Sequence, residues 1–167
     1  MPIQNVDRDN TRSELFFKNF FPDKQIDPWL YDTCFFLEVH QIRPQEAVEE
    51  TVELSRIIGI THGAYGPSST TVNWSDNWLG WFWRLGSGKG ESHRHNPFGN
   101  LYEAIAKQNT PDSFNFYLYR VSISGQSFYF IGEGHHRIMF LKLKGDQFFY
   151  FKRVVPATLL SDKAICF

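Results

Sequence analysis

The sequence predicts an α+β fold, a small mixed β-sheet with flanking helices, and three observations lead to this class. A chain of 167 residues is long enough for one domain with a sizeable core, and it is too short for two domains unless one of them is very small. Runs rich in aromatic and β-branched residues, which are typical of strands, concentrate in the range 51–160. Apolar residues at helical spacing precede and separate these runs. We therefore expect one domain over residues 1–167, with a helical N-terminal extension over 1–50 and a sheet-containing core over 51–160.

Composition and net charge limit the partners and the cellular compartment that we expect for this protein. A formal net charge of −1 disfavours a general polyanion binder, so any nucleic-acid contact requires a local basic patch. The 17 phenylalanines indicate a dense core. The N-terminus has no apolar signal core and no stretch approaches the length of a membrane span, so we expect a cytoplasmic protein without a membrane partner. Cys34 and Cys166 fit reduced thiols in such a compartment, and a disulfide between them remains an alternative.

The N-terminal extension is predicted to be mostly helical. Residues 10–13 offer a cap for a short helix that carries the apolar run Leu15 to Phe20 and ends at Pro22. The pair Asp27-Pro28 begins a second helix that runs to Glu38, and residues 43–50 favour one or two more helical turns. We interpret the extension as packing that covers one face of the sheet, with a partner-binding or dimerising arm as the alternative.

The core elements follow from β-branched and aromatic runs, turn residues and caps. In chain order they are expected as strands over 52–54 and 57–61, a helix over 101–107, a hairpin with strands over 115–123 and 127–131, a helix over 135–144 and a strand over 147–155. The hairpin turn is Ser124-Gly125-Gln126. Gly145 closes the last helix, and Pro156 is expected to stop the last strand.

A tryptophan stripe precedes the helix over 101–107. Trp74, Trp78, Trp81 and Leu85 recur at spacings of four, three and four, which places them on one helix face, and the whole cluster extends from Trp74 to Trp83. Such a stripe usually faces a core. The alternative is a platform on which a base or nucleotide ring stacks.

Residues 86–95 form a glycine-rich, mildly basic segment that is expected to be a surface loop. The segment resembles a phosphate-binding P-loop only in composition, because Trp83 stands where the first glycine is required and Gly90 follows Lys89. His93 and His95 would share a side of an extended chain, so a metal site there is an alternative, although no third ligand lies nearby in sequence.

The stretch Ile131 to Arg137 is the strongest candidate for a binding site. It follows an aromatic run and precedes the apolar run Ile138 to Leu141, so it is the turn from a buried strand into a helix. A helix N-terminus presents unpaired N–H groups and a positive dipole end, which attract anions and especially phosphate. Gly132 and Gly134 allow close approach of the backbone to a ligand, and Arg137 adds a fork of donors.

This stretch and its flanks resemble the ParB/sulfiredoxin-like superfamily. The family signature is a strand, a D-G-H-H-R or G-x-x-R box, and a helix, and the chain has the strand pair 116–121 and 128–131, then Gly-Glu-Gly-His-His-Arg over 132–137, then a helix closed by Gly145. Val52 to Gly59 is similar to the opening strand and turn, whereas residues 61–100 match poorly. The resemblance implies a ParB/sulfiredoxin-like fold and a nucleotide site at the box.

The roles of the box residues follow partly from their chemistry. Glu133 stands where the family often has Asp, and it could hold Mg²⁺ or act as a base, or simply interact with the helix dipole. Glu133, His135 and His136 are the candidate catalytic residues. The two histidines point about 100° apart on a helix, so we expect one to face the ligand and the other to orient the turn. Arg137 is predicted to contact phosphate, with a structural pair to a buried carboxylate as the alternative.

The resemblance also suggests the function. Members of the ParB/sulfiredoxin-like superfamily include sulfiredoxins, which use ATP, partition proteins, which use CTP, a free serine kinase and proteins called nucleases. His135 occupies the position of the sulfiredoxin cysteine, and too few residues follow the box for the DNA-binding domain of a partition protein. We therefore expect binding of ATP, ADP, CTP or another phosphate ligand with Mg²⁺, for phosphoryl transfer or phosphodiester hydrolysis. The alternative is a non-catalytic module that recognises a nucleotide, DNA or a protein partner.

Overall fold

The structure is a computed structural model that describes residues 9–37, 41–61, 76–86, 116–158 and 165–166. Its helices are α1 (Thr11–Phe20), α2 (Trp78–Gly86) and α4 (His135–Lys144), with 3-10 turns η1 (Pro28–Tyr31), η2 (Pro44–Glu46) and η3 (Leu54–Arg56). Its strands are β1 (Thr33–Leu37), β2 (Gln41–Ile42), β3 (Val48–Glu53), β4 (Ile57–Ile60), β5 (Asp76–Asn77), β6 (Tyr117–Ile123), β7 (Gln126–Glu133), β8 (Phe148–Thr158) and β9 (Ile165–Cys166). Helices and one mixed sheet together make an α+β fold, as the sequence predicts.

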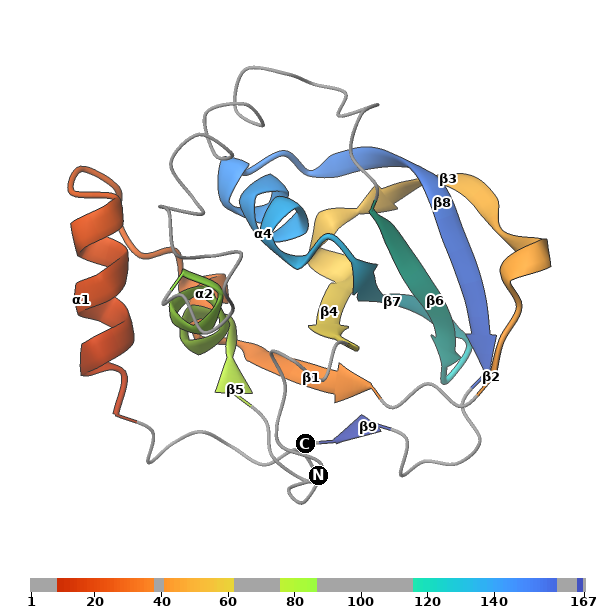
Figure 1. Ribbon diagram of the computed structural model, residues 1–167, viewed down its shortest axis with the longest axis horizontal. Coiled ribbons are helices and arrows are strands. Elements are labelled where there is room, and N and C mark those ends of the chain that lie inside the picture. The colour runs from red at the N-terminus through yellow and green to blue at the C-terminus, as the bar shows by residue number, and fades with distance from the viewer. Residues whose placement is uncertain (1–8, 38–40, 62–75, 87–115, 159–164, 167) are drawn as a thin grey trace.

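The described strands form a mixed sheet that is curled (Figure 1). The pairing order is β2-β8-β6-β7-β4-β1-β5, with β3 also on β8 and β9 on β1. The pairs β1–β4, β4–β7 and β6–β8 are parallel, and the others are antiparallel. Because of the curl, Glu50 of β3 accepts hydrogen bonds from Arg120 of β6 and Tyr129 of β7, although β3 pairs with neither strand.

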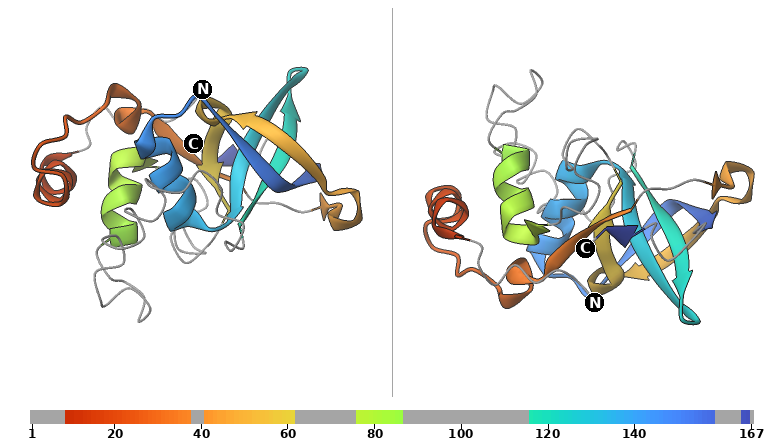
Figure 2. Two further views of the ribbon diagram at one scale, coloured as in Figure 1. Left: turned by 90° about the horizontal axis from the view of Figure 1, so that it is seen from above. Right: turned by 90° about the horizontal axis from the view of Figure 1, so that it is seen from below.

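The helices lie on one side of the sheet in successive positions, with α4 nearest to the sheet, α2 beside it and α1 outermost (Figures 1 and 2). Helix α4 contributes Ile138, Met139, Phe140, Leu141 and Leu143 to the same buried hydrophobic cluster as the sheet. Helix α1 packs on α2, where Phe17 is fully buried and its ring centroid lies 5.3 Å from that of Phe82. A single hydrophobic cluster thus extends from α1 through α2 and α4 to the sheet.

The predicted hairpin and the helix after it are confirmed, although β7 begins at Gln126 and continues to Glu133, past the predicted end at residue 131. Ser124 and Gly125 both have positive φ, 53° and 79°, which is the geometry of a two-residue turn that matches strand twist. The helix begins at His135 and ends at Lys144, the predicted residues. Gly145, at φ 92°, closes it by donating its N–H to the carbonyl of Lys142.

The helix predicted over residues 27–38 is wrong. Only η1 is helical there, and the chain then enters β1, which pairs in parallel with β4. Leu30, Cys34 and Leu37 are buried at spacings of four and three, but they belong to two different elements. Helical spacing therefore arises here by coincidence, and pairing on both sides of β1 decides its conformation.

Two further element boundaries differ from prediction. Residues 43–50 were expected to be helical, yet only η2 is, and β3 begins already at Val48 because it pairs along β8. Pro156 lies within β8 instead of ending it. The carbonyl of Pro156 accepts the N–H of Arg43 at 3.0 Å, so the backbone polar groups of Pro156 are directed toward β2. Because β2 is only two residues long, the missing N–H of the proline costs little pairing on that side.

Several predictions fall outside the described residues: Trp74, the loop segment 87–95 with His93 and His95, and the helix over 101–107. The rest of the tryptophan stripe is confirmed as core, since Trp78, Trp81 and Leu85 of α2 are buried. Within the described ranges, no helix combines the length and the apolar character that crossing a membrane requires.

Candidate functional site

The turn between β7 and α4 is built around Gly134. This residue holds left-handed backbone angles, φ 85° and ψ 42°, and its carbonyl accepts the N–H of Ile138 at 2.9 Å to start the helix. A Cβ at Gly134 would lie closer than 3.0 Å to the Cβ of Phe116. Glycine is thus required at this position. Because glycine has no side chain that could cap the helix, the N–H groups of the first helical turn lie next to the turn without a side-chain cap from this residue.

Gly132 is explained by aromatic packing. A Cβ at this position would lie closer than 3.0 Å to the ring of Tyr117, and the hydroxyl oxygens of Tyr117 and Tyr119 are 3.3 Å apart. The guanidinium carbon of Arg153 on β8 lies 4.8 Å from the centroid of the Tyr117 ring. Burial, and then the hydrogen bond with Tyr117, raises the pKa of Tyr119 to about 12, so its hydroxyl keeps its proton at neutral pH.

Sequence reasoning missed this group of Tyr117, Tyr119 and Arg153 beside the turn. The alternation of Tyr117 and Tyr119 along a predicted strand was a signal that both face the same side. Nothing local in the sequence places Arg153 beside them, because it comes from a strand that pairs with β6 only in the folded sheet.

The two histidines of the turn point in different directions. The Nε2–H of His136 donates to the carbonyl of Leu85 at 3.0 Å and so links α4 to α2. His135 is only 4% exposed and lines a small apolar cavity with Trp78 and Trp81. His136 thus makes the expected orienting hydrogen bond, whereas His135 faces the core.

Glu133 and Arg137 are the more accessible charged residues of the turn. Glu133 is exposed at the end of β7, where it is opposite Tyr117 in register, and Arg137 is half-buried in the first turn of α4. Glu53, at the end of β3, forms an ion pair with Arg56 at 3.5 Å. Among the described residues, no group of three or more His, Cys, Asp or Glu side chains is placed to hold a metal ion.

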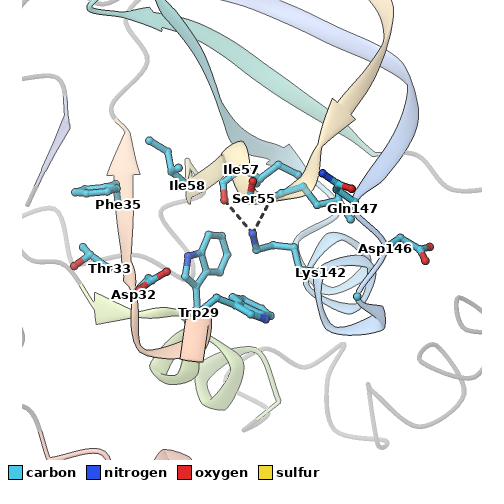
Figure 3. Close-up of a pocket in the computed structure, with 13 residues that line it drawn as sticks. Trp29, Asp32, Thr33, Phe35, Ser55, Ile57, Ile58, Lys142, Asp146 and Gln147 are labelled. Atoms are coloured by element: carbon cyan, nitrogen blue, oxygen red, sulfur yellow. Dashed lines mark hydrogen bonds between the residues drawn. The ribbon is translucent and has the colours of Figure 1, made fainter. Parts of the chain in front are cut away.

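A cavity of about 550 Å³ lies toward the other end of α4, beside Lys142 (Figure 3). The Lys142 amine donates to the carbonyls of Leu54 at 2.9 Å and Ile57 at 3.2 Å. Its nitrogen also lies 4.9 Å and 4.8 Å from the ring centroids of Trp29 and Trp78. Burial lowers the pKa of Lys142 from 10.5 to about 8, and the charges of Cys34 and Asp32 partly oppose this shift.

Sequence reasoning did not find this cavity. Its lining comes from four separate parts of the chain, η1 to β1, η3 to β4, α2 and α4, which only the fold brings together. One signal was available. Lys142 follows Ile138 by four residues, so a lone lysine occurs on the apolar face of a predicted helix.

The fold and the turn together define the class of protein, an α+β protein with a curled mixed sheet in which a strand passes through a left-handed glycine into a helix. In comparisons with known proteins, no protein-family model matches this chain, and neither a curated protein nor a solved structure matches it.

Proposed function

We propose that this protein binds a nucleotide or another phosphate-bearing small molecule at the turn from Gly132 to Arg137, for Mg²⁺-dependent phosphoryl transfer or phosphodiester hydrolysis. The observation that carries the proposal is the left-handed Gly134, which joins β7 directly to the N-terminus of α4. Strand, glycine turn and helix start are the arrangement in which N–H groups and the helix dipole favour an anion. The same arrangement is the basis for proposing a ParB/sulfiredoxin-like relationship.

Charged and aromatic residues near the turn support this function. Arg137 lies in the first helical turn, and a guanidinium can donate two parallel hydrogen bonds to a phosphate. Arg153 and the hydroxyls of Tyr117 and Tyr119 add donors from the neighbouring strands. Glu133 is the exposed carboxylate that would hold Mg²⁺ against the phosphate or act as a base.

One observation favours the alternative of a non-catalytic module that binds a nucleotide, DNA or a protein. Of the three residues predicted to be catalytic, His135 is buried and His136 holds α2 through its hydrogen bond to Leu85. Both histidines therefore serve to stabilise the turn. Of the three residues, only Glu133 is exposed and could act as an acid or base.

Thermal unfolding with ATP, ADP, CTP, GTP and inorganic phosphate, each with and without Mg²⁺, tests the proposal. A ligand that binds only the folded state adds about 2.7 kcal/mol at a hundred times its dissociation constant. For a domain of this size that is a shift of a few degrees in Tm. We expect one nucleotide to shift wild type and Arg12→Ala, an exposed α1 variant, but not Arg137→Ala.

A shift that is equal in Arg137→Ala and wild type would place the ligand elsewhere, and no shift with any compound would overturn small-nucleotide binding. For the nucleotide that binds, release of phosphate is then compared between wild type and Glu133→Gln. Turnover that Glu133→Gln abolishes while binding persists supports the enzyme, and binding without turnover supports the non-catalytic module.

A further inference from the structure

The cavity beside Lys142 is separate from the phosphate-binding turn. Lys142 is seven residues after His135 on α4, which corresponds to about 10 Å along the helix axis. We propose that Lys142 is a nucleophilic amine, and that the cavity binds a small planar carbonyl compound that condenses with this amine to form an imine. The two sites can be tested independently, because the proposed chemistry involves no residue of the turn.

A neutral amine at Lys142 can make both of the hydrogen bonds that the structure shows. A neutral amine has two N–H donors and one lone pair, and its two donors are satisfied by the carbonyls of Leu54 and Ile57. Both acceptors come from η3 and the start of β4, so they hold the nitrogen from one side. The lone pair is then directed away from these carbonyls. In Figure 3 the nitrogen lies in the middle of the lining residues, with Trp29 on the other side.

Burial without a direct ion pair favours the neutral form of Lys142. Among the described residues no carboxylate oxygen lies within 4.0 Å of its nitrogen, so no ion pair compensates for burial of the charge. Negative charge on Cys34, in β1, or on Asp32, which directly precedes β1, acts in the opposite direction: it raises the pKa of Lys142 and offsets part of the effect of burial. Asp146 also borders the cavity, but its carboxylate pairs with Lys144 and points away in Figure 3. A desolvated lysine of this kind is the usual source of an amine that attacks carbonyls.

The proposed reaction balances with water as the only other product. The Lys142 nitrogen attacks the carbonyl carbon, and a C–N bond forms while the carbonyl oxygen takes up a proton. The resulting carbinolamine loses its oxygen as water, which carries away both amine hydrogens, and leaves a C=N bond. Protonation of the imine from solvent restores one N–H and a positive charge. That cation would remain beside the rings of Trp29 and Trp78, whose faces attract positive charge.

The walls of the cavity indicate the class of carbonyl compound. A volume of about 550 Å³ is in the range of small-molecule sites, and indole rings with aliphatic side chains favour a flat apolar body. The aliphatic wall includes Ile57 and Ile58. Ser55 and Gln147 add polar groups at the same cavity, which suits a hydroxyl on the ligand. An aromatic aldehyde with one hydroxyl group fits this description.

Salicylaldehyde with sodium cyanoborohydride is the probe that tests the proposal, because the reductant converts an imine to a stable amine. At pH 7.5 the uncharged fraction is about 20% for an amine with a pKa near 8 and about 0.1% for an ordinary lysine. Peptide mapping by mass spectrometry is expected to show at least about tenfold more adduct on Lys142 than on Lys144, its neighbour on α4, or on the exposed Lys18. Raising the pH toward 9 should reduce this preference.

Two variants distinguish an aldehyde that binds in the cavity before it reacts with Lys142 from an aldehyde that reacts with Lys142 without binding there. Ser55→Phe places a ring in the cavity from an exposed position, and we expect it to reduce the Lys142 adduct at least about tenfold while the folded protein keeps its Tm. Lys142→Arg should leave only the background on other lysines. Equal adduct on Lys142, Lys144 and Lys18 would overturn the proposal and make Lys142 a structural cation. An adduct that Ser55→Phe leaves unchanged would overturn binding in the cavity.

Discussion

Gly125 and Gly134 have nearly the same φ angle and very different surroundings. Their φ values are 79° and 85°, in the left-handed region that favours glycine. A Cβ at Gly125 would meet nothing within 4 Å, whereas one at Gly134 would collide with Phe116. The two positions therefore separate the cost of backbone strain from the cost of a steric clash.

Substitution of each glycine by alanine should make that difference measurable. We expect Gly125→Ala to lower the free energy of unfolding by about 1 kcal/mol, from backbone strain alone. Gly134→Ala should cost roughly 2 kcal/mol more, since the clash is added to the strain. Urea denaturation of both variants checks this. Equal losses would mean that Phe116 moves aside at little cost and that the turn tolerates a side chain.

At the scale of secondary-structure elements, the helices stabilise one another by packing, and α1 shows this most clearly. It contacts α2 through aromatic residues, with Phe17 fully buried and Phe16 and Phe20 packed around Phe82. Leu15, on the other side of α1, is 61% exposed. The hydrogen bond from His136 to Leu85 connects α2 in turn to α4. Packing of α1 thus acts on α4, the helix that carries both proposed sites, through α2 and through the ring contact of Phe20 with Phe140, whose centroids lie 6.4 Å apart.

Truncation of Phe17 tests that dependence. Phe17→Ala should lower the free energy of unfolding by about 3–5 kcal/mol, the usual cost of deleting a buried ring. Leu15→Ala on the same helix should change it by less than about 0.5 kcal/mol. Chemical denaturation gives both values. A small loss for Phe17→Ala would indicate that α1 detaches from α2 without unfolding the rest, which limited proteolysis within α1 would reveal.

At the scale of the whole molecule, Glu50 connects three strands of the curled sheet. This carboxylate on β3 accepts a hydrogen bond from Arg120 of β6 at 3.0 Å and another from Tyr129 of β7. Burial, and then the hydrogen bond to Glu50, raises the pKa of Tyr129 from 10 to about 12. The stabilising contribution of the protonated tyrosine is complete below pH 10 and is lost as the pH rises toward 12.

A double-mutant cycle with Tyr129→Phe and Glu50→Ala measures this contact. Near pH 8 we expect a coupling of about 1 kcal/mol between the two positions, because they share one hydrogen bond. The stability difference between wild type and Tyr129→Phe should then decrease between pH 10 and 12. Additive single losses, or a difference that does not change with pH, would show that the hydrogen bond contributes nothing to the stability of the fold.

Local chemistry in the sequence determined the hairpin and the helix from His135 to Lys144. Residues 124–126 and the glycines at 134 and 145 specify turns by their own backbone preferences, so neighbours along the chain are sufficient to locate the elements between them. The location of the proposed phosphate-binding turn follows in the same way. The directions of its side chains do not, because burial of His135 and the hydrogen bond of His136 depend on α2.

Only the tertiary structure decided the elements and contacts that join distant segments. The segment 33–37 is a strand because β4 pairs with it, although its buried residues continue a helical spacing. The Lys142 cavity requires residues near 29, 55, 78 and 142 to meet. The physical reason is the same in both cases: strand pairing and burial are interactions between segments, and their free energy outweighs the weak preferences that a short stretch of sequence expresses by itself.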